Sequence, residues 1–481
     1  MHPTRRGGPC YHPRVNSRLK LAFVLFTAGC APQGKPTMES RSPGEAPHAI
    51  VSDAAHVADA AREPEESTGP ATDSATAKAD RPAQDPEVME AIETYARAML
   101  RDLAAARGVT PNDDWKVDFI DRAGIRAFVD GELAKQFTPA DLRIFGRIES
   151  AFGVIPFGVD ARKLLLDLYE ANVLGLYDPE RKTLFVGSFV TRRLLEMVLG
   201  HELGHGVQDM HVDLAAFLGS IRLGPQHGAA DKESARTCLV EGDAHATYLS
   251  WLAGAPGPAG VGDAELERMR EQILSIDDRA TAFPILARMQ QLPYAAGTAT
   301  VLQLAREQGW AAVDALYSDL PDTSEQMLHV DKLISREQPA EISIDRDALA
   351  REFAGLTLEW VDSRGEAAWL ATLAGPDTLH EAAVATEGWN GDLFVSLNRG
   401  DQAPAVLVGV TVWDTESDAK EFHRQLAKYP SIPAAPQVSL GYKRQGRNVF
   451  FVFTDPSALD EHLSNADDVF RIKRRTKRRT K

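Results

Sequence analysis

The chain has few cysteines and no long apolar segment. Three cysteines in 481 residues cannot build a disulfide framework, so the fold must be stabilised by its core. No apolar run reaches the roughly 18 residues of a membrane-spanning helix, which excludes a polytopic membrane protein. Basic residues are outnumbered by acidic ones, 53 to 69, and the formal net charge is −16. Because an acidic surface repels phosphate groups, we do not expect nucleic acid as a partner.

The N-terminus has the composition of an export signal. Residues 1–20 are basic and contain no acidic side chain, residues 21–26 are apolar, and three small residues precede Cys30. Because this apolar stretch is too short to span a membrane, residues 1–29 are predicted to be a signal peptide. The small residues before Cys30 resemble the lipobox of bacterial lipoproteins, which implies that Cys30 is acylated and becomes the mature N-terminus. An ordinary cleaved signal with an incidental cysteine is the alternative.

Two further segments lack the residues that build a core. Residues 31–86 contain no aromatic side chain and are rich in Ala, Pro, Asp, Glu and Ser. Such a composition cannot offset chain entropy by burial, so we interpret residues 30–86 as a lipidated, disordered tether to a membrane. Residues 471–481 are mostly Lys and Arg. They are expected to form a solvated basic tail, with contact to anionic lipid or another polyanion as the alternative.

Periodicity divides the rest of the chain into two units. Residues 87–375 are mainly helical in pattern, and residues 376–470 alternate as strands with two helices. In the first unit we expect a helix that stops before Gly108, a strand over 115–120, helices near 123–136, 139–151 and 160–172, a strand pair at 173–177 and 183–186, helices over 191–210, 230–253 and 263–276, and more helix between 297 and 360. In the second we expect strands over 392–397, 405–413 and 448–453, with helices over 416–428 and 457–463.

The pentapeptide His201-Glu-Leu-Gly-His205 is the clearest chemical signal. Residues four apart on a helix leave the same face, so the imidazoles of His201 and His205 can reach one zinc ion. Glu202 sits beside the first histidine, where a carboxylate can take a proton from metal-bound water. Glycines at 200, 204 and 206 each weaken the helix by about 1 kcal/mol relative to Ala. Their presence suggests that a neighbouring chain or a substrate backbone comes close.

A hydrolytic zinc site needs a third protein ligand and one open position, and two residues are candidates. His211 has the spacing of the H-E-x-x-H-x-x-G-x-x-H motif, but Gln208 stands where that motif needs its turning glycine. If the helix continues, His211 points about 120° away from His205. Glu241 lies on an apolar, strongly helical segment and is followed by Gly242, which permits close packing. We favour Glu241 as the third ligand; a charge on a solvated face is the alternative for it.

These motifs resemble those of gluzincin-type zinc metallopeptidases, in which a second helix presents a glutamate to the two histidines. The resemblance is closer to a group of poorly characterised exported bacterial and archaeal proteins that share a strand pair before H-E-L-x-H-x-x-Q-D and an E-G-[DE]-A helix. The matching segments are His201 to Asp209, Glu241 to Ala244, Pro293 to Gly297, Ser324 to His329, Trp389 to Asp392 and Trp413 to Glu416.

The resemblance also raises the question of which residues surround the metal. Better-known gluzincins have an aspartate four residues after the glutamate ligand, to orient a zinc histidine, and here that position is His245. Asp209 could orient a ligand instead, because ligating imidazoles usually donate their other N–H to a carboxylate or carbonyl; a helix-end charge is the alternative. A donor to the oxyanion is also needed, and the candidates are His245, Tyr248, Tyr294 and His329. Cys238 is expected to be a small buried residue.

Together these features predict an α+β protein with a mainly helical zincin-like domain, a short β-hairpin before its active-site helix, and a small C-terminal α+β domain. The expected function is that of an exported, lipid-anchored zinc metallopeptidase of the cell envelope, which hydrolyses peptide bonds with zinc-activated water and Glu202 as general base. The alternative is a catalytically inactive surface lipoprotein that uses a peptidase-like core for binding or scaffolding. A zinc hydrolase that acts on something other than peptides is also compatible with these residues.

Overall fold

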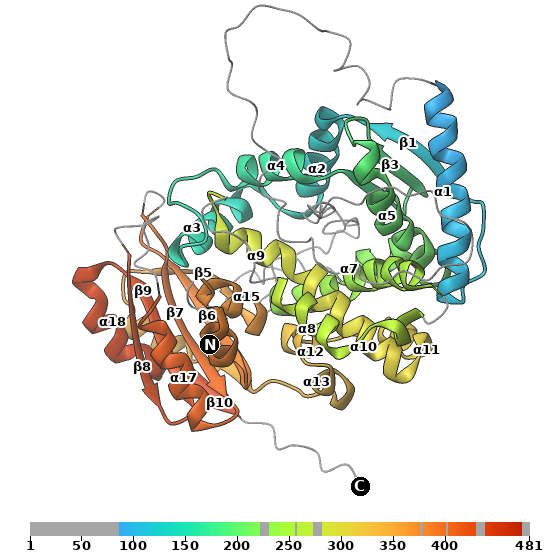
Figure 1. Cartoon of the computed structure of the whole chain (residues 1–481). Helices are drawn as coiled ribbons and strands as arrows, with labels where there is room; N and C mark the ends of the chain where they lie inside the picture. Colours follow the sequence, from blue (N-terminus) through green and yellow to red (C-terminus); the bar gives the residue numbers. More distant parts are fainter. Residues whose placement is uncertain are drawn as a thin grey trace, which may run out of the picture.

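The computed structural model describes residues 86–221, 230–254, 257–272, 281–375, 379–400, 403–429 and 438–473. The predicted signal peptide, Cys30, the tether before Pro86 and residues 474–481 of the basic tail lie outside the described residues. The chain is a mixed α+β protein with a helical N-terminal part and a C-terminal antiparallel sheet (Figure 1). In the described part, no helix is both long and apolar enough to cross a membrane.

The N-terminal part opens with a long helix and a three-stranded sheet. In chain order its elements are α1 (Pro86–Arg107), β1 (Lys116–Ile120), α2 (Arg122–Gln136), α3 (Pro139–Ala151), α4 (Ala161–Asn172), β2 (Gly175–Asp178) and β3 (Thr183–Gly187). Strand β3 lies between β1, which is parallel to it, and β2, which is antiparallel. The predicted strand pair and the three predicted helices before it are confirmed. Those helices start after Asp121, Thr138 and Asp160, whose side chains accept a backbone N–H of the first turn.

A stack of helices follows this sheet. It comprises α5 (Arg192–Val212), α6 (Leu214–Ile221), α7 (Ala230–Ala253), a short 3₁₀ turn η2 (Gly257–Gly260), α8 (Asp263–Glu271), α9 (Pro284–Leu292), a π-helical turn η4 (Pro293–Gly297), α10 (Thr298–Gln308), α11 (Trp310–Leu316), α12 (Ser324–Leu328) and α13 (Val330–Ser335). The long helices α5 and α7 were predicted, whereas α6, α9 and the π-helical turn were not. Helix α7 runs through the middle of the stack and contacts α5, η4 and α10 (Figure 1).

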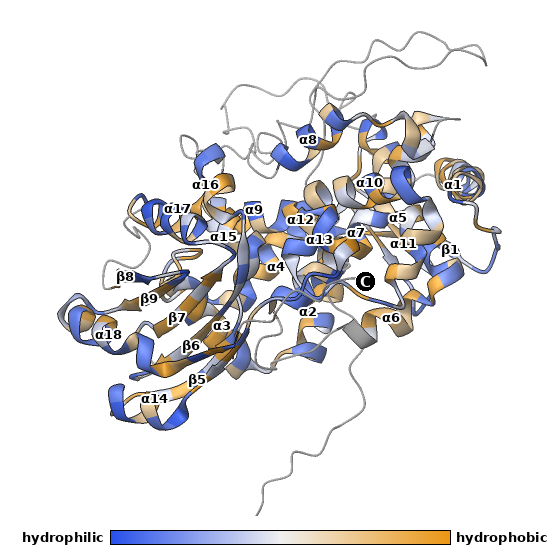
Figure 2. Cartoon of the chain, turned by 90° about the horizontal axis from the view of Figure 1, so that it is seen from below, coloured by the Kyte–Doolittle hydropathy of each residue, from blue (hydrophilic) through white to orange (hydrophobic). Residues whose placement is uncertain are grey.

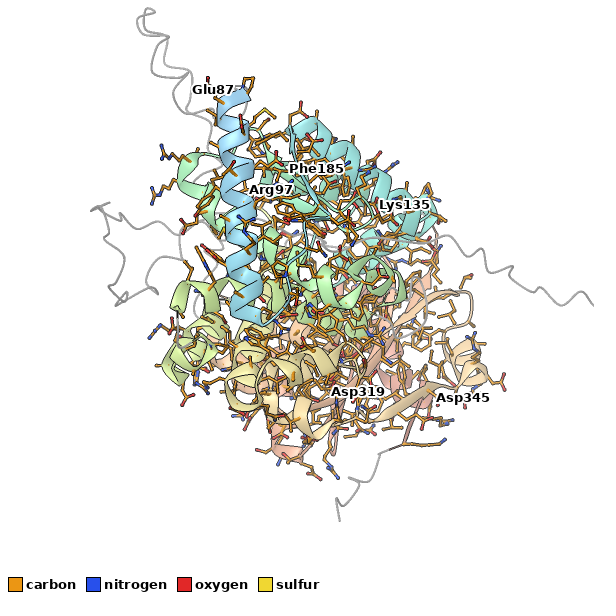
Figure 3. All side chains as sticks on the ribbon, turned by 90° about the vertical axis from the view of Figure 1, so that its right-hand side faces the viewer. Glu87, Arg97, Lys135, Phe185, Asp319 and Asp345 are labelled. Carbon is orange, nitrogen blue, oxygen red and sulfur yellow. The ribbon has the colours of Figure 1, made fainter. Side chains whose placement is uncertain are left out.

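Helix α1 closes one side of the helical part (Figure 1). Its buried residues, among them Met99 and Leu103, share a core with Leu199 and Leu203 of α5. Arg97 of α1 is labelled in Figure 3. Its guanidinium carbon lies 4.9 Å from the centroid of the Trp115 ring and thereby links α1 to the segment before β1. The helix that carries the histidine motif is therefore supported from two sides, by α1 and by the three-stranded sheet.

The C-terminal part is a five-stranded antiparallel sheet with helices on both faces. Its elements are β4 (Glu341–Ile344), α14 (Arg346–Glu352), β5 (Thr357–Asp362), α15 (Gly365–Leu373), α16 (Leu379–Thr386), β6 (Trp389–Asn398), β7 (Val406–Trp413), α17 (Glu416–Leu426), β8 (Ser439–Gln445), β9 (Asn448–Thr454), η5 (Pro456–Ala458), α18 (Leu459–Asn465), η6 (Ala466–Val469) and β10 (Phe470–Lys473). The strand order is β5-β6-β7-β9-β8, and β4 pairs with β10 in a separate ribbon. Figure 2 shows how apolar the central strands are.

Alternate residues of the central strands serve two different cores. Phe451 and Phe453 of β9 pack with Trp369 of α15 and Phe422 of α17. Their neighbours Phe450 and Val452 pack on the opposite face, with α14, η6 and β10. This alternation is the two-residue period of a strand that is covered on both faces. Because both faces are buried, these strands are rich in apolar residues, and β6, β7 and β9 could be predicted from the sequence.

The two parts share one hydrophobic core. Phe152, at the end of α3, is completely buried among residues of the C-terminal sheet. Its ring makes edge-to-face contacts with Trp369 at 5.9 Å, Phe394 at 5.3 Å and Phe453 at 5.1 Å between centroids. Beside it, Arg364 pairs with Glu149 at 3.0 Å, and both are buried. The N-terminal part therefore contributes Phe152 to the hydrophobic core on one face of the C-terminal sheet.

The C-terminal sheet starts earlier in the chain than its composition indicated. The expected boundary falls at residue 376, yet β5 (Thr357–Asp362) is already an edge strand of the sheet. Helices do occur between 297 and 360, as expected, but the last of them ends at Glu352, and the same range also contains the strands β4 and β5. Both strands are short, and β4 pairs with a partner more than a hundred residues later in the chain. Local periodicity carries no signal for such a pairing.

Candidate metal centre

Two histidines of α5 and one glutamate of α7 converge in the helical part. Nε2 of His201 lies 3.3 Å from Oε2 of Glu241, and Nε2 of His205 lies 3.5 Å from the same oxygen. The potential ligand atoms of the three residues all lie within 4.8 Å of one another. Among the described residues, they form the one group of this kind. The structure therefore brings together the three residues that the sequence predicts as metal ligands.

The spacing of these atoms suits a tetrahedral metal ion. Zinc bonds of about 2.0–2.1 Å at tetrahedral angles place neighbouring ligand atoms about 3.3 Å apart. The two nitrogen–oxygen distances, 3.3 and 3.5 Å, agree with that spacing. Both Nε2 atoms and both carboxylate oxygens are buried and have no hydrogen-bond partner within the described residues. Buried polar atoms normally have a partner, so this donor set fits a divalent cation such as zinc.

Burial and mutual attraction shift the pKa values of the ligands in opposite directions. Burial disfavours the charged form of Glu241, but the two imidazoles outweigh it and lower the pKa of Glu241 to about 2. Burial disfavours the protonated form of His205, but the carboxylate of Glu241 outweighs it and raises the pKa of His205 to about 9. The carboxylate is therefore ionised at neutral pH and supplies the negative charge that a divalent cation needs.

Glycines bring the two ligand-bearing helices into direct backbone contact. A Cβ atom on Gly204 of α5 would stand 2.4 Å from the carbonyl oxygen of Ala244 on α7. On the other side of α7, a Cβ atom on Gly242 would stand 2.4 Å from the carbonyl carbon of Gly297 in η4. Gly297 in turn approaches the carbonyl oxygen of Cys238 to 2.3 Å by the same measure. Of the three glycines in and beside the histidine motif, Gly204 is the one that a neighbouring backbone approaches closely, as the sequence indicated; Gly206 meets only side chains, the nearest of them Leu100 at 3.3 Å.

Glu202 is completely buried beside the ligands. The strand β2 crosses α5 at this point, and a Cβ atom on Gly175 would stand 3.4 Å from Cγ of Glu202 and 2.7 Å from a methyl group of Val198. Only a glycine allows the strand to lie so close to the helix. The predicted hairpin before the motif thus packs directly against the side chain of Glu202, the predicted general base.

The structure replaces Asp209 by Gln208 as the partner of a ligand. Asp209 accepts hydrogen bonds from the hydroxyl group of Tyr177 at 2.8 Å and from the amide of Leu214 at 2.9 Å. It also pairs with Lys182 at 3.2 Å. Asp209 therefore fixes the end of α5, which was the alternative for it, and it does not orient a ligand. Oε1 of Gln208 lies 2.8 Å from Nδ1 of His205 instead. From the sequence, Gln208 is apparent only as the residue that breaks another motif.

Of the four predicted oxyanion donors, two lie beside His201. The ring centroid of Tyr294 is 5.4 Å from that of His201, and the ring of His245 is 5.7 Å from it. Burial and the neighbouring His201 lower the pKa of His245 to about 3, so its imidazole is neutral. Tyr294 belongs to the π-helical turn η4. Such turns are rare and often occur at functional sites, because they displace side chains from the helical register.

The other two predicted donors are occupied elsewhere. Tyr248 packs its ring against Gly200, whose Cβ position is 2.2 Å from the ring, and it stacks on Trp251. Nε2 of His329 lies 2.9 Å from Oε1 of Glu366 on α15. Carboxylates near His329, above all Glu366, outweigh the effect of burial and raise its pKa to about 9. The structure therefore corrects the expectation for these two residues.

The motif from Ser324 to His329 joins α7 to the C-terminal part. The amide of Ser324 donates to Asp231 in the first turn of α7 at 3.0 Å, and its hydroxyl accepts from the amide of Ala367 at 3.1 Å. Glu325 pairs with Lys332, and both side chains are largely buried. This explains the motif by packing and hydrogen bonding rather than by catalysis.

The Trp-Asn-Gly-Asp motif is also structural. The buried carboxylate of Asp392 accepts hydrogen bonds from both indoles next to it, Trp369 at 2.8 Å and Trp389 at 3.1 Å. It also accepts the backbone amides of Arg364 and Gly365. In the second tryptophan motif, Thr415 caps helix α17.

The two remaining candidates from the sequence lie apart from the ligand atoms. Nε2 of His211 approaches Asp314 to 3.3 Å, and Nδ1 lies 2.9 Å from the carbonyl oxygen of Val207, so this histidine faces away from the metal centre. Cys238 is fully buried in the core around α7, as expected for a small apolar residue. Glu241 is thus the third member of the group, as the sequence analysis favoured.

Comparison with known proteins bears on the C-terminal part. Residues 344–476 match a family model described as a domain of unknown function (DUF8575). The matched segment contains the five-stranded sheet and none of the three potential metal ligands. No curated protein and no solved structure shows a significant match to the chain.

Proposed function

We propose that this chain is a zinc-dependent metallopeptidase with a zincin-like helical domain. The observation that carries the proposal is the convergence of His201, His205 and Glu241, whose buried donor atoms lie within 4.8 Å of one another, with nitrogen–oxygen distances of 3.3 and 3.5 Å. Glu202 follows the first ligand directly and is buried beside it. A purely structural zinc site has four protein ligands and no need of an adjacent base, whereas three ligands and a carboxylate suit hydrolysis.

The roles of the side chains follow from their charges. His201 and His205 would hold the ion with neutral imidazole lone pairs, and Glu241 would hold it with its ionised carboxylate. A bound zinc ion supplies Lewis acidity, which acidifies water and polarises a carbonyl group. Glu202 would accept the proton of the attacking water and pass it to the leaving amine, which is general base and then general acid catalysis.

Tyr294 is the best donor for the developing oxyanion. Its ring lies beside His201, and a phenol can donate a hydrogen bond without carrying charge. His245 is neutral, so it can act there through hydrogen bonding but not as a cation. His245 and Tyr294 are half-buried residues, and His201 is 6% exposed whereas Glu202, His205 and Glu241 are 0% exposed. Substrate would therefore approach from the side of His201, between these two rings.

A peptide is the proposed substrate, and the proposed location is the cell envelope. The predicted signal peptide and lipid anchor would export the enzyme and attach it to a membrane through Cys30. The peptidase would then act on peptides or proteins outside the cytoplasm, at a distance set by the tether.

The test uses the purified full chain. We expect one zinc ion per chain and cleavage of a quenched peptide library, both abolished by a strong chelator and restored by zinc. The variants His201→Ala and Glu241→Ala should lose zinc and cleavage together. Glu202→Gln should retain zinc while its turnover falls by a factor of about 100 to 10,000, which is the usual contribution of a general base.

Three outcomes decide among the functions. Unchanged cleavage by Glu202→Gln would refute the mechanism. Zinc binding without cleavage of any peptide would favour the scaffolding function, or a hydrolase for another bond. A full chain without zinc affinity would refute the metal centre itself.

A further inference from the structure

Gln208 contacts both ligand-bearing helices at once, and it is almost completely buried. It lies on α5, one turn after His205. Its Oε1 faces Nδ1 of His205 at 2.8 Å, and its Nε2 lies 2.7 Å from the carbonyl oxygen of Val240 on α7. Val240 directly precedes the ligand Glu241. One amide group therefore contacts one ligand and the backbone next to another.

We propose that Gln208 is a positioning residue, which selects the nitrogen that His205 presents to the metal and holds α7 in register with α5. The inference rests on the proposed function, because it concerns how the same metal centre is assembled. It assigns no reacting role to Gln208, which acts only through His205 and Glu241.

The partners of the amide fix its orientation. The carbonyl oxygen of Val240 can only accept a hydrogen bond, so the amide nitrogen of Gln208 must face it. The amide oxygen then faces His205, and an oxygen can only accept. Nδ1 of His205 must therefore carry a hydrogen, which makes Nε2, 3.5 Å from Oε2 of Glu241, the nitrogen that is available to the ion.

A second hydrogen-bond chain prevents the amide from turning over. Nε2 of Gln208 also donates to the hydroxyl oxygen of Tyr317 at 2.9 Å. Tyr317 uses its own hydrogen toward Oδ2 of Asp243, likewise at 2.9 Å, and Asp243 is paired with the buried Arg107 at 3.3 Å. A turned amide would place its nitrogen against an N–H of His205 and its oxygen against the carbonyl of Val240. Both contacts would be repulsive, so one orientation is strongly preferred.

This arrangement explains why the residue is an amide rather than a carboxylate. A glutamate at this position could still accept from His205, but it has no hydrogen for Val240 or Tyr317. A buried carbonyl and a buried hydroxyl oxygen would then lose their donor. Only a side chain with an acceptor at one end and two donors at the other satisfies all three neighbours.

The chain offers a matched control for the experiment. Gln326 of α12 is as deeply buried as Gln208, at 1% exposure for both. Like that of Gln208, its amide group both donates and accepts: it donates to the backbone carbonyl of Glu337 at 2.7 Å and accepts from the backbone amide of Asp322 at 2.8 Å. It makes no contact with the metal centre in the described hydrogen bonds. Substituting either glutamine by methionine removes the same polar group at nearly constant volume.

The experiment compares Gln208→Met, Gln208→Glu and Gln326→Met with the unaltered full chain. Zinc affinity is measured by competition with a chromophoric chelator, the geometry of the site by the visible spectrum of the cobalt-substituted protein, and folding by the melting temperature without metal. We expect Gln208→Met to weaken zinc binding about 10- to 100-fold and to change the cobalt spectrum. Gln326→Met should lower the melting temperature but leave zinc affinity and spectrum unchanged. Gln208→Glu should recover zinc affinity relative to Gln208→Met, because it restores the acceptor for His205, without recovering the melting temperature.

The outcomes separate this inference from the proposed function. If the unaltered chain binds zinc tightly and Gln208→Met does so equally well, the positioning role is refuted and the metal centre stands. If Gln326→Met weakens zinc binding as much as Gln208→Met, the effect is one of general stability and the positioning role is likewise refuted. If the unaltered chain binds no zinc, the metal centre is refuted and this inference with it.

Discussion

The carbonyl oxygen of Ala244 lies 2.4 Å from the position that a Cβ atom would take on Gly204. No side chain fits in that space, so α5 and α7 meet backbone to backbone at the level of the ligands. This contact brings Glu241 within 3.3 to 3.5 Å of the two imidazoles, although it is 36 residues after His205 in the chain. The glycine of the histidine motif is therefore required for the close approach of the three potential ligands, although it contributes no ligand atom.

Gly204→Ala should separate the two helices and disrupt the centre. The new methyl group meets a backbone atom that cannot move aside, so we expect a loss of about 3 kcal/mol or more in the free energy of unfolding. Zinc affinity should fall as well, because Glu241 moves with α7. Gly131→Ala is the control: Gly131 lies within helix α2, and its Cβ position has no atom within 4 Å. That variant should gain about 0.5–1 kcal/mol. Equal stability of the two variants in denaturant titrations would contradict the role of the contact.

Tyr294→Phe should impair catalysis without affecting the metal. Removal of one oxyanion donor typically costs a factor of about 100 to 1,000 in turnover, and the phenyl ring preserves the packing against His201. We expect kcat to fall by about that factor, while KM and zinc content stay the same. Tyr248→Phe is the matched control, because the ring of Tyr248 is packed between Gly200 and Trp251 and, unlike that of Tyr294, makes no ring contact with His201 among the described residues. Equal turnover of the two variants would exclude Tyr294 as the donor.

Asp231→Asn should change how stability depends on pH. Burial, opposed by the hydrogen bonds from Ser324, raises the pKa of Asp231 to about 7 from an ordinary value near 3.8. The folded state therefore binds this proton more tightly than the unfolded state, so stability falls as the pH rises from about 4 to about 7. The asparagine variant lacks that loss and should be more stable than the unaltered chain at pH 8, by up to about 4 kcal/mol. Denaturant titrations at pH 4 and pH 8 measure it, and parallel pH dependences of the two proteins would contradict it.

Phe152→Ala, a substitution in the N-terminal part, should destabilise the core that this part shares with the C-terminal sheet. A fully buried phenylalanine that is truncated to alanine typically costs about 3–5 kcal/mol. We expect that loss in thermal or denaturant unfolding. The same substitution at Phe145, on the same helix α3 but 37% exposed, should change stability by less than about 0.5 kcal/mol. If both variants unfold alike, the two parts do not depend on the shared core.

The sequence predicted the parts of the fold that local patterns determine. The helices that start after Asp121, Thr138 and Asp160 were predicted from the local sequence pattern, and the structure adds a capping side chain in front of each. The metal ligands were visible for a similar reason, since a spacing of four residues and the glycine after Glu241 are local features.

Contacts between distant segments could not be predicted in this way. The role of Gln208 depends on Tyr317, which is 109 residues later in the chain, and on the carbonyl group of Val240. The ribbon of β4 and β10 joins segments more than a hundred residues apart. His329 was a reasonable oxyanion donor until the structure placed Glu366 beside it. In each case a side chain of suitable chemistry acquired its role from a neighbour that the sequence does not reveal.

Helix α7 also has a mechanical consequence. In its first turn, the amide of Ala230 donates to Asp362 of β5 in the C-terminal part, and Asp231 accepts from the amide of Ser324 in α12. Ten residues further on, about 15 Å along an unbroken helix, the same rod carries Glu241. One continuous helix therefore connects the end of β5, at Asp362, to the position of Glu241. The C-terminal sheet thus helps to fix where the carboxylate of Glu241 lies, although it contributes none of the three potential metal ligands.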